Sequence, residues 1–286
     1  MTLSIPHLVG KYVQIGRTQT WYTEQQTAGT GPLAVNTIVG LNGLAGGGDS
    51  FWTLLDELRP GWRAIMPDLP GCGKSGLLPT RHDLQGYVAW LDQFLARFSP
   101  NRPVVLQTVA TGAAIALEYA LLYPQRVAGL ILHLPMFDGS AFAPLARWLV
   151  AGLVQRDVVQ RLADHYRHDQ QFMLKLIAHE PPQAIYETAM RDIQHKQEAS
   201  LRAVGEFLSV VMLNKARPKL LRVRSPMLML ATAHDFAAPV GWLQEVAAMY
   251  PHERTLEVEE GGHAWNEEYV GKMVGLVRTF LGELNG

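Results

Sequence analysis

The stretch that decides the fold is Pro103–Leu132, PVVLQTVATGAAIALEYALLYPQRVAGLIL. Its apolar run Val104–Leu106 predicts a strand, and Ala113–Leu122 predicts a helix that Tyr123-Pro124 ends. The compact segment Thr108–Gly112 lies between them. The stretch therefore predicts the order strand, sharp turn, helix and strand.

This pattern resembles the nucleophile elbow of the α/β-hydrolase superfamily, in which a G-x-S-x-G turn lifts a serine to the top of a parallel sheet. Ala110 stands at the position of that serine and Thr108 at the position of the first glycine, whereas Gly112 is retained. An alanine methyl group cannot attack a carbonyl or carry a covalent intermediate. The chain as written is therefore inactive as a covalent serine hydrolase.

Two later segments match the acid and histidine turns of the same superfamily. Asp235 lies in the segment ATAHDFAAPV, ahead of a proline, and His263 lies in the turn EEGGHAW. Both follow the elbow in the chain order typical of the family. The resemblance implies that Asp235 orients His263 and that His263 acts as the base.

A glycine-rich loop follows a strand predicted at Asn36–Leu41 and begins Asn42-Gly43-Leu44. In the family this loop usually begins His-Gly, and a backbone N–H just beyond it forms half of the oxyanion hole. The match makes the N–H groups of Leu44 and Thr111 the two oxyanion donors, and both survive the loss of the serine. The alternative is that the glycine run is only a flexible loop.

The segment Asp68–Ser75, DLPGCGKS, resembles a further turn of the superfamily, whose role there is mainly structural. It is not a phosphate-binding loop, because Asp68 occupies the position of the first glycine in that motif. The glycine loop after Asn42 also lacks the spacing of a dinucleotide site. No cofactor is expected.

Composition sets the class of protein. The 286 residues are 48% hydrophobic and 18% charged, which is enough apolar surface for one ordinary globular core. The net charge of -1 is spread without runs of one sign, so we expect neither nucleic acid nor an anionic membrane as a partner. The single cysteine, Cys72, excludes an intrachain disulfide and a cysteine-cluster metal site. The N-terminus lacks the pattern of a signal peptide, and we expect a cytoplasmic protein.

The resemblance covers about Tyr12 to Leu284 and implies an α/β-hydrolase fold, with a mostly parallel eight-stranded sheet, helices on both faces and a helical cap. We expect residues 1–136 and 217–286 to form the core, and residues 137–216 to form a cap inserted after the sixth strand. The cap is rich in apolar side chains, which favours a small, largely apolar ligand. Its three histidines, His165, His168 and His179, have no supporting ligand set, so no metal site is expected.

Outside the elbow, the hydrophobic pattern predicts further strands and helices. The predicted strands are Tyr12–Ile15, Thr18–Tyr22, Ala64–Pro67, Val127–Leu134, Pro226–Leu230 and Arg254–Val258. The predicted helices are Phe51–Leu58, Asp83–Phe98, Trp242–Tyr250 and Asn266–Leu284.

Three explanations of Ala110 stay open. In the first, the chain is a serine hydrolase that was changed at position 110 and whose substrates are small, largely apolar esters or related compounds. In the second, it is a natural member of the family in which His263 and Asp235 catalyse a noncovalent reaction. In the third, it is a catalytically silent binding or regulatory protein with a protein partner. Thr108 and Asn42 favour natural divergence, whereas the retained Asp235 and His263 favour an enzyme. Each explanation places His263 within hydrogen-bond reach of Asp235 and beside the methyl group of Ala110. Asp138 is the alternative acid.

Overall fold

The computed structural model describes residues 10–26, 36–43, 62–154, 201–249, 254–263 and 267–284. Several of the predictions lie outside these ranges. They are the oxyanion donor Leu44, the helix Phe51–Leu58, and the part of the cap, residues 155–200, that contains His165, His168 and His179.

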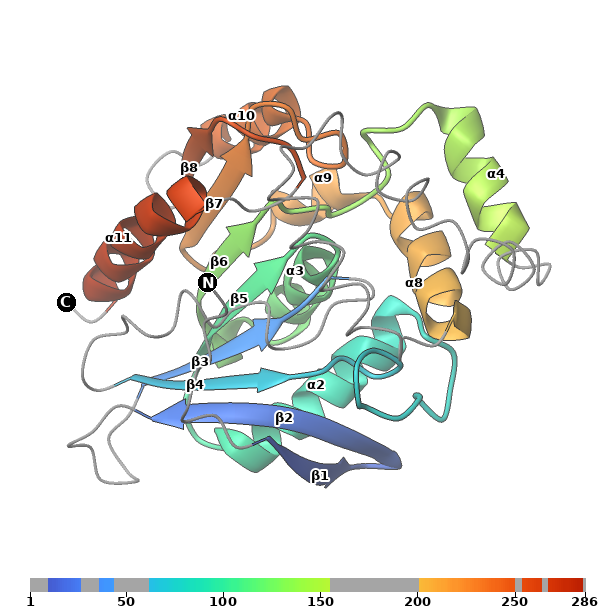
Figure 1. Ribbon diagram of the computed structural model, residues 1–286, viewed down its shortest axis with the longest axis vertical. Helices are drawn as coiled ribbons and strands as arrows, with labels where there is room; N and C mark the ends of the chain where they lie inside the picture. Colours follow the sequence, from blue (N-terminus) through green and yellow to red (C-terminus); the bar gives the residue numbers. More distant parts are fainter. Residues whose placement is uncertain are drawn as a thin grey trace.

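The predicted eight-stranded, mostly parallel sheet is confirmed, with the strand order β1-β2-β4-β3-β5-β6-β7-β8 (Figure 1). β2 pairs antiparallel with both β1 and β4, and the remaining pairs are parallel. The strands are β1 (Lys11–Ile15), β2 (Thr18–Gln26), β3 (Asn36–Leu41), β4 (Trp62–Pro67), β5 (Val104–Val109), β6 (Val127–His133), β7 (Met227–Thr232) and β8 (Arg254–Glu259).

The strand before the elbow is longer than its apolar run predicts. β5 continues through Gln107 and Thr108 to Val109, because these residues pair with Ile131, Leu132 and His133 of β6. Backbone pairing with a buried neighbour overrides the polar side chains at the end of the strand. The elbow therefore starts directly at the last hydrogen-bonded residue of the strand.

Helices cover both faces of the sheet, as predicted. α2 (Leu84–Phe98), α3 (Gly112–Leu122) and α10 (Val240–Ala248) share one core with alternate strand residues such as Leu106 and Leu130. α11 (Glu267–Glu283) packs on the other face, against Val105, Ile131 and their neighbours. Successive side chains of a strand point to opposite faces of the sheet, and helices bury both faces here. The strand sequences are therefore continuous apolar runs.

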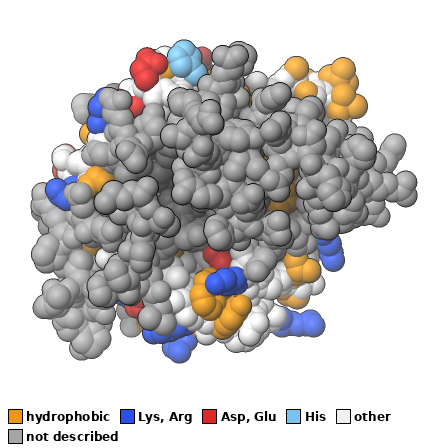
Figure 2. All heavy atoms as spheres, in the orientation of Figure 1, with side chains coloured by type: hydrophobic (Ala, Val, Ile, Leu, Met, Phe, Trp, Pro, Cys, Tyr) orange, Lys and Arg blue, Asp and Glu red, His pale blue; other side chains and the backbone are white. Residues whose placement is uncertain are grey.

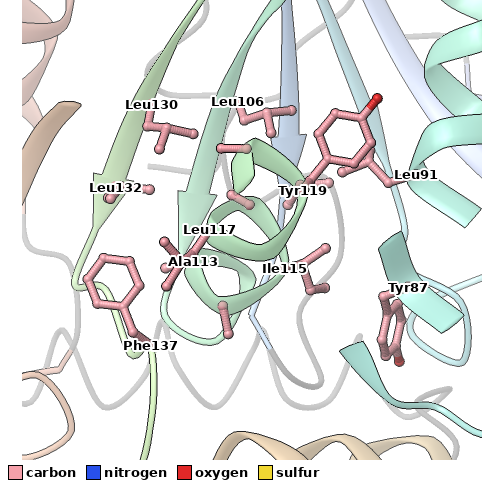
Figure 3. Packing of buried hydrophobic residues seen from close by; sticks show 14 of the residues in the cluster. Tyr87, Leu91, Leu106, Ala113, Ile115, Leu117, Tyr119, Leu130, Leu132 and Phe137 are labelled. Atoms are coloured by element: carbon pink, nitrogen blue, oxygen red, sulfur yellow. The ribbon is translucent and has the colours of Figure 1, made fainter. Parts of the chain in front are cut away.

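α3, the helix after the elbow, lies in the middle of the larger core. Figure 3 shows the sheet residues Leu106, Leu130 and Leu132 on one side of α3 and Tyr87 and Leu91 of α2 on another. Most of its residues are fully buried, which is typical of a helix that is apolar all round. α3 ends at Leu122, with Tyr123 as its C-cap, and a single 3-10 turn, η2 (Pro124–Arg126), leads into β6.

The chain between β6 and β7 contains α4 (Pro144–Val154), α8 (Leu201–Leu213) and α9 (Ala216–Leu220), and the part of it that is described has no strand. Figure 1 shows α4 and α8 on the side of the sheet toward which the arrowheads of β3 and β4 point. α8 touches the core where the Phe207 and Tyr87 rings lie 4.6 Å apart. A lid function of residues 137–216 stays a prediction.

The two ends of this insertion are hydrogen-bonded to each other. Asp138 accepts hydrogen bonds from the backbone N–H groups of Ser140 and Ala216, at 2.8 and 2.9 Å, and Asn214 Nδ2 donates to the Phe137 carbonyl at 2.9 Å. A buried carboxylate without hydrogen-bond partners costs free energy, so these bonds are needed by Asp138. Because they join residues at both ends of the insertion, Asp138 closes the insertion at its base. Asp138 therefore has a structural role and does not face His263 as its acid partner.

Among the helices that are described, none is long and apolar enough to cross a membrane.

Candidate active site

The elbow keeps its strained backbone although it lacks a serine. Ala110 has φ 47°, in the left-handed region that non-glycine residues rarely occupy. Its N–H donates to the His133 carbonyl at 3.0 Å, and its carbonyl accepts from the N–H of Met136 at 3.1 Å. The chain that leaves β6 thus holds both sides of the turn. The conformation of the elbow is imposed by these backbone contacts and does not need a hydroxyl group.

Two glycines let the elbow touch the loop after β3. A Cβ atom on Gly112 would lie 2.3 Å from the Leu41 carbonyl oxygen, and one on Gly43 would lie 3.2 Å from the Cβ of Ala110. The first distance is too short for any side chain, because it involves backbone that cannot turn away, and the second is a tight contact that would require a small shift. The predicted oxyanion loop therefore reaches the elbow directly. Leu44, the next residue of this loop, lies outside the described ranges.

Asn42, which replaces the usual histidine of this loop, is completely buried. Its Oδ1 accepts a hydrogen bond from the N–H of Leu69 at 3.4 Å, and its Nδ2 donates to the Gly43 carbonyl at 3.0 Å. A buried amide is stable only with such partners. Asn42 consequently connects the loop after β3 to the turn Asp68–Ser75, which explains how this loop keeps its position without the family's histidine.

His263 and Asp235 form the predicted pair. The Nδ1 atom of His263 lies 2.9 Å from each carboxylate oxygen of Asp235. The Asp235 side chain is 0% exposed, and its Oδ1 also accepts from the N–H groups of Ala237 and Ala238 at 2.8 and 3.0 Å. Because the carboxylate oxygens accept, Nδ1 of His263 carries the proton and Nε2 is the basic nitrogen.

Hydrogen bonds to the end of β7 hold the histidine loop over Asp235. Thr232 Oγ1 donates to the Gly262 carbonyl at 2.8 Å, and the N–H of His234 donates to the Gly261 carbonyl at 2.9 Å. Gly261 has φ 142°, which a side chain would oppose. The loop that follows β8 is thereby folded back across β7, where Asp235 begins its turn.

An aromatic side chain that the sequence analysis did not single out lies against His263. The Phe236 and His263 rings are 5.4 Å apart at an interplanar angle of 63°, and Phe236 is 42% exposed. The ring of Phe142 lies 6.4 Å from that of Phe236 at an interplanar angle of 77°. The sequence signal for Phe236 was its size, because it is the only large residue in the turn DFAAP that carries the acid.

A buried polar pair supports the base of the elbow on the α11 face. Nε2 of Gln107 lies 3.0 Å from Nε2 of His133. Complete burial lowers the pKa of His133 to about 3, so the ring is neutral and its Nε2 accepts from the amide. This pair is internal to the sheet and is not part of the candidate catalytic group.

Within the ranges that the structure describes, no group of three or more His, Cys, Asp or Glu side chains could hold a metal ion.

The predicted site residues follow the carboxyl ends of parallel strands. Ala110 and Thr111 follow β5, Asp235 follows β7 and His263 follows β8. The carboxyl ends of parallel strands meet at one edge of the sheet, where ligands of open α/β sheets bind. The structure brings His263 and Asp235 into hydrogen-bond contact. The approach of the Ala110 methyl group to the imidazole, and the oxyanion role of Thr111 and Leu44, stay predictions.

Comparison with known proteins supports the fold. A family model described as "alpha/beta hydrolase fold" matches residues 36–268. The magnesium-chelatase 30 kDa subunit of Rhodobacter capsulatus is 29% identical over 265 residues, covering 88% of this chain and 89% of that protein. The pimeloyl-[acyl-carrier protein] methyl ester esterase of Xanthomonas campestris pv. campestris is 27% identical over 235 residues, covering 79% and 87%.

Solved structures show the same architecture at lower identity. The bromoperoxidase of Bacillus anthracis superposes with a TM-score of 0.78 at 15% identity, over 96% of this chain and 100% of that chain. At this identity the likeness concerns the fold alone.

Proposed function

Because this chain belongs to the α/β hydrolase fold family, we propose that it binds a small, largely apolar ester or related acyl compound and acts on it without a covalent acyl-enzyme. The observation that carries the proposal is the hydrogen-bonded His263–Asp235 pair, in a chain whose elbow has Ala110, which offers no nucleophile, at its apex. The general base His263 remains, but the serine hydroxyl that it would deprotonate in a serine hydrolase is missing.

In the proposed reaction Nε2 of His263 takes a proton from a water molecule as the water oxygen attacks the carbonyl carbon. Asp235 fixes the tautomer and stabilises the imidazolium that forms. The N–H groups of Leu44 and Thr111 would stabilise the negative charge on the carbonyl oxygen. The imidazolium then returns its proton to the leaving alkoxide, and the acid and the alcohol are released.

The proposed substrate class follows from the side chains around His263 and from one relative. Phe236 and Phe142 make the neighbourhood of the imidazole apolar. The relative in Xanthomonas campestris is named as a methyl ester esterase. We propose that residues 137–216 form a helical lid over this site, because Phe142 belongs to the start of that segment and contacts Phe236.

The test is turnover of a panel of small esters by the unmodified chain. Hydrolysis above the buffer rate, linear from the first turnover without a burst, is expected, and His263→Ala should reduce it by a factor of 100 or so. His234→Ala is the matched control, because His234 is a neighbouring but exposed histidine whose ring Nε2 lies 3.4 Å from Glu260. Turnover that His263→Ala leaves intact, or none at all, would refute the proposal.

A second candidate is a binding subunit without catalysis. The relative in Rhodobacter capsulatus, which matches most of this chain, is named as a subunit of magnesium chelatase. α4 also exposes Leu145, Trp148 and Leu149, which lie on one side of the helix at spacings of three and four, and Figure 2 shows hydrophobic side chains at the surface where α4 lies. This candidate predicts saturable partner or ligand binding that survives His263→Ala.

A further inference from the structure

The turn that holds Asp235 also determines where Phe236 lies. The Asp235 carboxylate accepts hydrogen bonds from the N–H groups two and three residues later, those of Ala237 and Ala238. Such a turn closes the backbone around the carboxylate. Phe236, the residue between the acid and these N–H groups, is left outside the closed turn, beside the histidine that the same carboxylate orients.

Phe236 is far more exposed than the residues on either side of it. It is 42% exposed, whereas Asp235 on one side and Ala237 on the other are buried. His263 and Phe142 meet it at interplanar angles of 63° and 77°, so neither ring is stacked parallel on it. An exposed aromatic surface therefore adjoins the base and continues to Phe142 of the insertion.

From this arrangement we propose that Phe236 and Phe142 form an aromatic contact that selects ligands with a flat aromatic group next to the bond that His263 addresses. We use the term aromatic contact for Phe236 together with Phe142. The two residues determine specificity and are not catalytic. This role rests on the proposed function in that the His263 site is taken to be the ligand site. It adds the class of ligand, which the family and the His263–Asp235 pair leave open.

The preference for an aromatic group has a physical basis beyond apolar burial. Aromatic pairs in offset or edge-to-face geometry gain about 0.5–1.5 kcal/mol more than their buried area accounts for. That gain corresponds to a factor of about 2 to 12 in affinity. A cyclohexyl group is similar in size and more apolar than a phenyl group, so simple hydrophobic burial would favour the saturated ring. The two classes of contact therefore predict opposite orders of affinity.

The experiment uses 2-phenylethanol and 2-cyclohexylethanol, which have no scissile bond, so binding is measured separately from the chemistry of the proposed function. Isothermal titration of the unmodified chain should give tighter binding of 2-phenylethanol, by a factor of about 2 or more. Phe236→Leu, which keeps an apolar side chain of similar volume, should reduce this ratio to one or less, and Phe142→Leu should reduce it by a smaller factor.

Tyr12→Leu is the matched control. Tyr12 is an aromatic residue that is 51% exposed on β1, the edge strand at the opposite end of the sheet from β8, so its replacement should leave the ratio unchanged. A ratio of one in the unmodified chain, a ratio that Phe236→Leu does not alter, or absence of binding of both alcohols would overturn the inference. If Phe236 only held His263 in place, both affinities would change equally. Failure of ester turnover with a retained binding ratio would refute the proposed function alone.

Discussion

The two halves of the candidate site differ in what each has kept. The half that follows β7 and β8 keeps its side-chain chemistry, with Asp235 bound to His263 and to two backbone N–H groups. The half that follows β5 keeps its backbone, with Ala110 at φ 47° between two hydrogen bonds, but has no reactive side chain. The shape of the elbow and its reactivity are therefore specified by different atoms.

The comparison shows where each half obtains its stability. The elbow depends on the close approach of Gly112 to the Leu41 carbonyl and on the backbone hydrogen bonds of Ala110, and neither involves a reactive side chain at position 110. The acid–base half depends on side-chain hydrogen bonds, so it cannot lose a side chain without leaving buried donors unsatisfied. Substitution at the apex is consequently inexpensive for the fold, whereas substitution at Asp235 is not.

The largest effect is expected from Gly112→Ala in the elbow half. The added Cβ would lie 2.3 Å from the Leu41 carbonyl oxygen, so the strand end or the helix must move. We expect the free energy of unfolding to fall by about 3 kcal/mol, measured by urea denaturation. Gly275→Ala in α11 is the matched control, because a Cβ there meets nothing within 4 Å, and it should raise stability by up to about 1 kcal/mol. Equal effects of the two variants would contradict the close contact.

Asp235→Ala tests the other half. It leaves the N–H groups of Ala237 and Ala238 and the Nδ1–H of His263 without their buried acceptor. The expected loss is about 2–3 kcal/mol in the same denaturation experiment. The nitrogen shifts of His263 in an NMR spectrum should also show a change in the tautomer. Ala110→Ser, by contrast, changes only the apex and adds no branch at Cβ; a loss from Asp235→Ala below that from Ala110→Ser would reverse the comparison.

The pH dependence of stability probes the buried pair under the elbow. Burial lowers the pKa of His133 to about 3, while its ordinary value is 6.5. The unfolded chain therefore binds a proton between these values and the folded chain does not, so stability is full above pH 6.5 and is lost as the pH falls toward 3. Between pH 8 and pH 5 the loss from this group is about 2 kcal/mol.

His133→Gln should remove this part of the pH dependence, because glutamine does not titrate and can still bond to Gln107. Some dependence should remain, since burial also lowers the pKa of His82 despite its contact with Glu206. Urea midpoints of both proteins at pH 8 and pH 5 provide the measurement. An undiminished difference between the two pH values in His133→Gln would show that His133 is not kept neutral in the fold.

The smallest effect is expected at the apex itself. Ala110→Gly relieves the left-handed strain, about 1–2 kcal/mol, but adds backbone entropy to the unfolded chain. The net change in the free energy of unfolding should be a gain below about 1 kcal/mol. Ala120→Gly in α3 is the control, because this helical alanine is unstrained and its loss should destabilise the protein by about 1 kcal/mol. A clear destabilisation by Ala110→Gly would mean that the turn is not strained.

Most of the sheet and the acid–base half could be predicted from sequence, because apolar runs of strand length and the turns around Asp235 and His263 are local patterns. The ends of β5 and β7 could not, since polar residues there are held by pairing with neighbouring strands. Phe236 and the Gln107–His133 pair were missed for a related reason. Their roles arise from contacts between segments far apart in the chain, and the local sequence does not show which residues will make such contacts, even where, as for Phe236, a large side chain stands out in its turn.

The most direct test of the central claim, that the elbow half retains a working geometry, is to give it a nucleophile. Ala110→Ser should be labelled covalently and stoichiometrically by a fluorophosphonate, because the serine hydroxyl would lie beside the basic Nε2 of His263. The unmodified chain should not be labelled, and the double variant Ala110→Ser with His263→Ala should lose most of the labelling rate. A folded Ala110→Ser protein that fails to react, or that reacts equally without His263, would contradict the placement of Ala110 opposite the His263–Asp235 pair.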